Sequence, residues 1–278
     1  MTRPAHARRT PRGPDASHAH GDARARGAAG NTPPAITRIL SVDVGGTKIK
    51  ALATGNTEPR KAPSGRRFTP KAMVLAVKQL AKGWTYDAVS IGIPSLVGHA
   101  GPKSEPGNLG GGWVGFDYAA AFGLPVKVMN DAAMQALGSY EGGRMLFIGL
   151  GTGVGAAMIA ENAIVPLELG DLPWNRHRES LHDVLGREGL RRFGLAEWRR
   201  VVGTALVKLM HAFIADYVVI GGGNAKRLRS LPHGIRRGHN LTAFRGGARL
   251  WGVNDVPILT TAPPVAPEAH VALDWRML

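Results

Sequence analysis

The chain has 278 residues, with 35 Lys and Arg against 20 Asp and Glu, a formal net charge of +15. It contains no cysteine, which excludes disulfides and thiolate metal sites. No apolar run approaches the ~18 residues of a membrane helix, and no apolar segment follows Arg8 and Arg9 as in a secretory signal, so we expect a cytoplasmic protein without a membrane partner. The charge favours an anionic partner such as nucleic acid or polyphosphate; a basic, solvated surface is the alternative.

Residues 1–35 contain six Arg, two Asp and almost no large apolar side chain. Such a composition cannot bury enough surface to fold, so we predict a disordered basic tail, whose role the sequence leaves open. The remaining length allows one large or two ordinary domains. We place an N-terminal α/β domain at 36–129 and a C-terminal α/β domain at 130–278, whose last segment could pack back on the first domain.

The first strand is predicted from the apolar, β-branched run after Ile36, which ends in a glycine turn. Glycine allows positive φ and close approach of backbone N–H groups to a ligand. Around Gly45 and Gly46, the residues Asp43, Thr47 and Lys48 add a carboxylate, a hydroxyl and a cation. A carboxylate beside an anion-binding turn is typical of a site where Mg²⁺ joins protein and phosphate. An ordinary hairpin turn is the alternative.

Five further elements are predicted before residue 141: a hairpin strand from Ala51, a helix at 70–82, strands at 87–94 and 124–129, and a helix at 132–140. Asn130 and Asp131 stand where the last of these strands ends and the helix begins. A carboxylate at that place could cap the helix, which is the alternative to a chemical role for Asp131.

The second half opens with another strand, glycine turn and strand at 144–159, which repeats the pattern of the first loop. Residues 172–192 are polar and rich in His and Arg, and no element is predicted there. A helix follows at 196–213, with its apolar residues on one face, and a third strand at 216–224 ends in glycines. The repeated unit predicts two related halves that face a cleft.

Common nucleotide and catalytic signatures are absent from the sequence. There is no Gly-x4-Gly-Lys-Ser/Thr, and Val154 stands where the dinucleotide fingerprint needs its third glycine. The protein-kinase Asp-Phe-Gly and the hydrolase Gly-x-Ser-x-Gly are missing, and no His or Glu cluster has metal-ligand spacing. The glycine loops therefore belong to another class of phosphate site.

Three loops resemble, in order and content, those of the actin-like ATPase and sugar-kinase fold: Asp-Val-Gly-Gly-Thr-Lys at 43–48, Gly-Leu-Gly-Thr-Gly at 149–153 and Gly-Gly-Gly-Asn at 221–224. The match sharpens to the ROK family of sugar kinases. Within that family, three segments look like polyphosphate glucokinases: 143–155, 165–170 and 216–226. The similarity covers about residues 37–255.

The resemblance implies a two-domain α/β fold of the actin-like ATPase (ribonuclease H-like) type, with an interdomain cleft that holds a hexose. It implies phosphoryl transfer from polyphosphate, ATP or both, with Mg²⁺, to the 6-hydroxyl of glucose or a related hexose. Family members dimerise through the region that corresponds to residues 162–213, so a homodimer is expected by analogy.

The resemblance also assigns roles to residues. Asp131 matches the general base, which accepts the proton of the sugar 6-hydroxyl. Asn108, Asn130 and Glu168 match sugar ligands, the two amides offering both donors and acceptors. The positions that match phosphate contacts are Asp43, which would also hold Mg²⁺ indirectly, Gly45, Gly46, Thr47 and Lys48 from one domain, and Gly151, Thr152 and Gly153 from the other. The residues expected near the nucleoside end are Gly221, Gly222 and Gly223.

Two positions depart from the family pattern. The usual Glu-x-Gly-His has Asp171 in place of its histidine, and His182 aligns with a glutamate that normally completes the sugar site. Both belong to the same predicted wall of the sugar pocket. Three hypotheses stay open: a swapped carboxylate–histidine pair that holds the same sugar edge, a changed sugar preference, or a lost activity. The zinc-site cysteines of many ROK members are also absent, as is common in polyphosphate-type members.

Two function classes remain. In the first, an enzyme, six basic residues are candidates for a polyphosphate track, although an individual surface residue of this kind is more often simply solvated: Arg187, Arg191, Arg192, Arg199, Arg200 and Lys226. The second is a non-catalytic sugar-sensing protein. ROK repressors carry an N-terminal helix-turn-helix, for which residues 1–35 are too short and too poor in apolar residues, so no specific nucleic-acid partner is expected. Because Asp131 and all three glycine loops are present, we favour the kinase.

Overall fold

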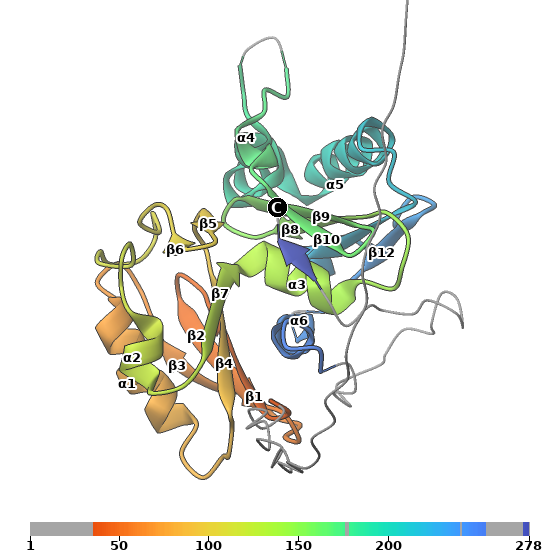
Figure 1. Ribbon diagram of the computed structural model, residues 1–278. Coiled ribbons are helices and arrows are strands. Elements are labelled where there is room, and N and C mark those ends of the chain that lie inside the picture. The colour runs from red at the N-terminus through yellow and green to blue at the C-terminus, as the bar shows by residue number, and fades with distance from the viewer. Residues whose placement is uncertain (1–35, 176–177, 240, 254–274, 278) are drawn as a thin grey trace, which may run out of the picture. The chain divides into compact units, whose positions relative to one another are not determined.

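The computed structural model describes residues 36–175, 178–239, 241–253 and 275–277 (Figure 1). By their internal contacts, residues 36–278 make up one unit. That unit contains two main β-sheets with helices packed against them. The tail predicted at 1–35 lies outside the described residues.

The first sheet has the strand order β3-β2-β1-β4-β7. Its strands are β1 (Ile39–Val44), β2 (Lys48–Ala53), β3 (Arg60–Pro63), β4 (Ala88–Ile93) and β7 (Val126–Asn130). The first three form an antiparallel meander, whereas β4 pairs in parallel with both β1 and β7. Every residue of β1 and β4 is buried, as expected for central strands covered on both faces.

Two helices pack against one face of this sheet: α1 (Pro70–Leu80) and α2 (Tyr118–Phe122). Helix α1 begins at its proline, and the side chain of Thr69 caps it by accepting a hydrogen bond from the backbone N–H of Ala72. A short hairpin between β4 and α2 consists of β5 (Val97–Gly98) and β6 (Gly101–Pro102).

The second sheet has the order β12-β11-β8-β9-β10-β13. Its strands are β8 (Met145–Leu150), β9 (Val154–Ala160), β10 (Ala163–Leu167), β11 (Tyr217–Gly221), β12 (Ile235–Arg237) and β13 (Arg276–Met277). Alternate residues of β8 point to opposite faces: Leu146 and Ile148 join the core on one side, and Met145 and Phe147 the core on the other.

One face of this sheet is covered by α4 (Leu181–Leu185) and α5 (Arg187–Ala212), with the short turns η1 (Leu169–Asp171) and η2 (Ala225–Arg227) nearby. Helix α5 contains a break at Gly194, whose φ of 72° is not helical. The other face is covered by α3 (Asp131–Ser139).

Helix α3 also crosses α6 (Thr242–Arg249), which lies beside β1 and β4 of the first sheet (Figure 1). The crossing is close because glycines form it: a Cβ on Gly138 would overlap the carbonyl of Thr242, and one on Gly246 would overlap that of Met134. The buried hydroxyl of Ser41 donates to the carbonyl of Phe244 at 3.0 Å, which ties α6 to β1. The start of α3 is thus held by elements from both sheets.

Most predicted elements are present, within a few residues of their expected ends. The alternative of a capping role for Asp131 is wrong: Asn130 caps α3, accepting from the N–H of Ala133 at 3.1 Å. The region 172–192, for which no element was predicted, contains α4 and the first turns of α5. We retain the boundary between residues 129 and 130 as our proposal for dividing the two halves.

Candidate active site

A cavity of about 340 Å³ opens where the glycine turns of both sheets meet the start of α3. Many of the predicted site residues line it: Gly45, Gly46, Asn108, Asn130, Asp131, Gly151, Thr152, Gly153, Glu168, His182 and Gly222. Other predicted residues are not part of its lining: Asp43, Thr47, Lys48, Asp171, Gly221 and Gly223. Residues that were not predicted also line it, among them Ser95, Gln135 and Phe147.

Asp131 is the first residue of α3 and is half-buried at the cavity wall. Its Oδ1 accepts a hydrogen bond from the N–H of Ala132 at 2.8 Å. Burial raises the pKa of Asp131 to about 7, and the nearby charges of Asp43 and Glu168 act in the same direction, against the Ala132 N–H. A carboxylate with a pKa near neutrality is suited to accept a proton from a substrate and to release it again.

Asn130 holds this corner in place from both ends of its amide. While its oxygen caps α3, its Nδ2 donates to the carbonyl of Ser95 at 3.1 Å. Ser95 follows β4, so the amide of Asn130 links the ends of two neighbouring parallel strands. The placement of Asp131 therefore depends on strand pairing as well as on its own helix.

Asp43 lies near the end of β1 and is almost fully buried. The hairpin register puts it opposite Lys50, and Lys50 Nζ lies 2.8 Å from Asp43 Oδ2. Lys48, which was predicted to face phosphate, is exposed and pairs with Pro63 of β3. The sequence did contain a signal for Lys50, since a two-strand register around Gly45 places it across from the carboxylate.

The glycines of the first turn are needed for close approach rather than for positive φ. Neither Gly45 nor Gly46 is among the residues with positive φ, so that sequence expectation is wrong for this turn. A Cβ on Gly46 would lie 2.5 Å from Nδ2 of Asn108. Gly222 does have a positive φ, of 80°, and a Cβ there would overlap the carbonyl of Leu150.

His182 stands at the opposite wall of the cavity. Its Nδ1 accepts from the N–H of Val154 at 2.8 Å, and its Nε2 lies 3.8 Å from Asp171 Oδ1. The ring occupies the space that a Cβ on Gly153 or on Gly170 would take. The two residues that depart from the family pattern are therefore neighbours.

Glu168 completes this wall with a third ionisable side chain. Burial raises its pKa, the charge of Asp171 adds to the rise, and His182 opposes it. Of these three side chains, Glu168 and His182 line the cavity, and Asp171 lies beside His182 outside the lining. A carboxylate and an imidazole offer hydrogen-bond acceptors and a donor to a polyhydroxylated ligand.

The chain is similar in sequence to known sugar kinases. Residues 39–166 match the model of the ROK family. Over 218 residues it is 24% identical to the polyphosphate glucokinase of Mycobacterium tuberculosis, an alignment that covers 70% of this chain and 82% of that protein.

Solved structures agree on the fold. The inorganic polyphosphate/ATP-glucomannokinase of Arthrobacter sp. strain KM superimposes with a TM-score of 0.67 at 24% identity, covering 78% of this chain and 99% of that one. A ROK family transcriptional regulator, a homologue of the E. coli MLC protein, gives 0.59 at 16% identity and covers 77% of each chain. The predicted α/β fold is confirmed, since the chain shares its fold with ROK sugar kinases of the actin-like ATPase type.

Gln135 is a polar residue of the smaller cavity, and the sequence analysis did not predict it. It lies one helical turn after Asp131 on α3 and lines the cavity with Phe147. In the described part of the chain, only four buried side-chain polar atoms have no hydrogen-bond partner, and two of them, Asn108 Oδ1 and Gln135 Oε1, belong to this cavity. A ligand or a water molecule in the cavity can supply the donor that these two acceptors lack.

A divalent cation fits the site as a partner of phosphate and not of a protein cage. The described residues hold no group of three His, Asp or Glu side chains that could bind a metal ion. Asp43 offers a carboxylate whose Oδ2 is bound to Lys50. Mg²⁺ usually takes one or two carboxylates together with substrate phosphates and water, and Asp43 meets that need.

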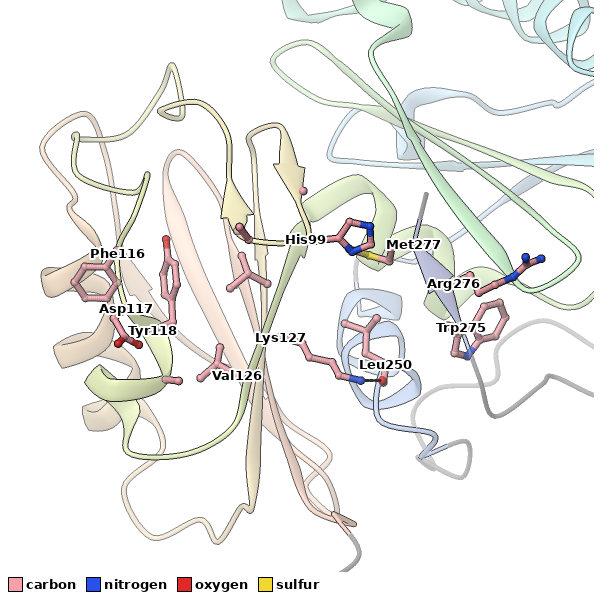
Figure 2. Close-up of a pocket in the computed structure, with 15 residues that line it drawn as sticks. His99, Phe116, Asp117, Tyr118, Val126, Lys127, Leu250, Trp275, Arg276 and Met277 are labelled. Carbon is pink, nitrogen blue, oxygen red and sulfur yellow. Dashed lines mark hydrogen bonds between the residues drawn. The ribbon is translucent and has the colours of Figure 1, made fainter. Parts of the chain in front are cut away.

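A second, larger cavity, of about 680 Å³, is lined by residues of β7, α2, the β5–β6 hairpin and β13 (Figure 2). Its acid, Asp117, caps α2 by accepting from the N–H of Ala120. Lys127 donates to the carbonyl of Leu250 at 2.7 Å and lies over the ring of Trp251. These two side chains already have structural partners, whereas the smaller cavity contains the predicted site residues, so the smaller cavity is the better candidate for the active site.

In the part of the chain that the structure describes, no helix is both long enough and apolar enough to cross a bilayer.

Proposed function

We propose that the protein is a hexose kinase, which transfers a phosphoryl group from polyphosphate, ATP or both to the 6-hydroxyl of glucose or a related hexose. The observation that carries the proposal is Asp131, a carboxylate whose pKa is raised to about 7, in a cavity lined by two glycine turns. The names of the Mycobacterium and Arthrobacter relatives support the substrate classes.

In the proposed reaction, Asp131 accepts the proton of the sugar 6-hydroxyl as that oxygen attacks the terminal phosphorus. The new O–P bond forms while the bond to the bridging oxygen of the donor breaks, and the donor leaves one phosphate shorter. Asn108 and Asn130 orient the sugar, with Glu168, Asp171 and His182 at its other edge. The turns at Gly45–Gly46 and Gly151–Gly153 receive the phosphates. The N–H groups of Gly45 and Gly151 donate within these turns, to the carbonyls of Lys48 and Gly153, so they hold the turns in shape.

We propose Mg²⁺ as the metal, which donor phosphate oxygens would hold, with Asp43 as the carboxylate that the resemblance assigns to it. When bound, the ion neutralises charge on the phosphates and aligns them. Lys50, in its ion pair with Asp43, fixes the carboxylate and adds a positive charge beside the turn. Thr47 and Lys48 are exposed at this turn and remain proposed phosphate contacts, as do Thr152 and the segment Gly221–Gly223.

A second function is favoured by one observation, the pairing of Asp171 with His182 on the sugar wall. If this pair presents the wrong donors and acceptors to glucose, the protein is a kinase for another sugar or a sugar sensor without turnover. The similarity to a ROK transcriptional regulator in fold is compatible with sensing.

The deciding experiment incubates purified protein with Mg²⁺ and glucose, supplies either polyphosphate or ATP, and measures glucose 6-phosphate. Asp131→Asn should lose turnover. Asp117→Asn is the matched control, because Asp117 caps α2 outside the site and asparagine caps equally well. If the Asp131→Asn variant keeps the turnover of the wild type, the assignment of Asp131 as the base is wrong. If neither glucose, mannose nor another hexose is phosphorylated, the result favours the alternative of a sugar sensor without turnover.

We also propose a homodimer and a cytoplasmic location. Two exposed apolar side chains, Leu172 and Leu195, with 46% and 39% of their surface accessible, lie within residues 162–213, the region expected to form the interface. Light scattering on the purified protein tests this, and a monomer at micromolar concentration would count against it.

A further inference from the structure

Asn108, a proposed sugar ligand, lies on a loop that is closed by a hydrogen bond of its own. The carboxylate of Glu105 accepts from the N–H of Trp113 at 3.0 Å. The side chain of Trp113 is fully buried in the core beside the first sheet. We call residues 105–113 the sugar loop. Because the loop is closed at its base, the position of Asn108 depends on where that base is anchored.

The hydroxyl of Ser95 fastens the start of the sugar loop to the end of β4. Ser95 lines the smaller cavity, yet only 8% of its surface is accessible. Its Oγ donates most closely to the carbonyl of Ser104, at 2.5 Å, and lies 3.2 Å from the Ser104 hydroxyl. Ser104 immediately precedes the sugar loop. A hydroxyl has one proton to donate, so the Ser95 hydroxyl serves the loop and not a ligand.

The backbone of Ser95 is bonded to another part of the site. Its carbonyl accepts from Nδ2 of Asn130 at 3.1 Å, and Asn130 caps the helix that begins with Asp131. One residue is therefore bonded to two functional segments. Its side chain holds the loop that carries the proposed sugar ligand Asn108, and its main chain holds the start of the helix that carries the proposed base.

We propose that Ser95 is a positioning residue, which holds Asn108 where it can bind the sugar beside Asp131. This inference rests on the proposed function and deepens it by naming a residue on which recognition of the hexose depends. Without the Ser95 hydroxyl, the sugar loop keeps its internal hydrogen bond but loses its link to β4, so Asn108 is less well oriented. Asp131 keeps its own contact with the N–H of Ala132, so the effect falls on sugar binding more than on the chemical step.

The test compares three substitutions that each remove one hydroxyl. Ser95→Ala breaks the link. Ser104→Ala is the matched control at the other end of the link, because Ser104 accepts mainly through its carbonyl, which alanine retains. Ser90→Ala removes a buried hydroxyl of β4 that donates to the carbonyl of Gly247 at 2.6 Å, outside the cavity lining, and controls for lost stability. Ser95→Thr, which keeps a hydroxyl, tests for rescue.

Steady-state kinetics give kcat and the KM for each substrate, calorimetry without a phosphoryl donor gives the Kd for glucose, and thermal melts report stability. For Ser95→Ala we expect the KM and Kd for glucose to rise about tenfold, with kcat and the KM for the donor within about threefold of wild type. Ser104→Ala and Ser95→Thr should bind glucose like wild type, and Ser90→Ala should melt at a lower temperature with an unchanged KM.

Three results would overturn the proposal. The first is an unchanged Kd for glucose in Ser95→Ala. The second is an equal loss of glucose binding in Ser104→Ala, Ser90→Ala or Ser95→Thr. The third is a loss confined to kcat or to the KM for the donor, because a residue that positions the sugar ligand acts on the sugar.

Failure of this inference and failure of the kinase proposal give different results. If wild type binds a hexose without phosphorylating it, and Ser95→Ala weakens that binding, the kinase is refuted and the positioning role stands. If both proteins phosphorylate glucose with the same KM, the kinase stands and the positioning role is refuted. If wild type binds no hexose at all, both are refuted.

Discussion

His182 accepts a hydrogen bond from the backbone N–H of Val154 through Nδ1, at 2.8 Å. A ring nitrogen that accepts carries no proton, so the neutral imidazole has its proton on Nε2. Nε2 is the atom that lies 3.8 Å from Asp171. This hydrogen bond thus fixes the orientation of the ring and leaves Nε2 as the edge available to a ligand. It also joins the start of β9 to α4.

This arrangement predicts the outcome of exchanging the pair. Asp171→His and His182→Glu should each lower kcat/KM for glucose by about tenfold or more, because each leaves two like groups on one wall. The double variant should recover most of the loss, since glutamate at 182 can accept from Val154 as the imidazole does. Steady-state kinetics with varied glucose measure this.

A control separates the sugar contact from the Val154 bond: His182→Gln keeps a hydrogen-bond acceptor for Val154 but changes the group presented to the sugar. A double variant as inactive as the single ones would rule out the swapped pair and favour a changed sugar preference.

Asp131 predicts how activity depends on pH. Because its pKa is raised to about 7, the proton-accepting form is the minority below that value and dominates above it. We expect kcat/KM to rise about tenfold between about pH 6 and pH 8 and then level off. A rate that is flat across this window would show that another group accepts the proton.

The same pKa predicts an effect on stability. The raised pKa means that ionised Asp131 is less favourable in the folded chain than in the unfolded one, so stability is present at low pH and lost as pH rises through about 7. The loss begins above the unfolded pKa of about 4, so Asp131→Asn should gain more stability relative to wild type at about pH 8 than at about pH 5, with a difference on the order of 1–3 kcal/mol. Urea unfolding at both pH values measures the difference, and an equal effect at both would contradict it.

Gln135 is expected to contact the phosphoryl donor, because it lines the cavity beside Phe147 and its Oε1 has no partner within the described chain. Gln135→Leu should raise KM for the donor by about tenfold while leaving the melting temperature unchanged or higher. Gln79→Leu, on the exposed face of α1, is the matched control. If Gln135→Leu instead raises only the KM for the sugar, then Gln135 contacts the sugar and not the phosphoryl donor.

The crossing of α3 and α6 predicts a sensitive position away from the chemistry. A Cβ on Gly246 would overlap the carbonyl of Met134, so Gly246→Ala must push the helices apart and should cost about 1–3 kcal/mol of unfolding free energy. In α5, a Cβ on Gly203 meets nothing within 4 Å, and Gly203→Ala should instead stabilise slightly. Denaturant unfolding compares the two, and similar effects would argue against a tight crossing.

Much of the site was readable from local patterns. Apolar runs that end in glycine turns predicted β1 and β8, and the residues around those turns predicted phosphate binding near Gly46 and Gly151. The local pattern placed Asp131 directly after a strand, but its role as a base came from the family resemblance. Such features depend on neighbours in sequence, where periodicity and turn chemistry act.

Tertiary structure decided the rest. Lys50, and not Lys48, meets Asp43 because strand register places it there. His182 reaches the glycine turn because α4 packs against β9, and α6 closes the core through contacts with strands some two hundred residues earlier, such as Ser41 to Phe244. A sequence fixes which side chains are available and how they alternate locally, but which of them meet depends on register and packing between distant segments, where no local period carries the information.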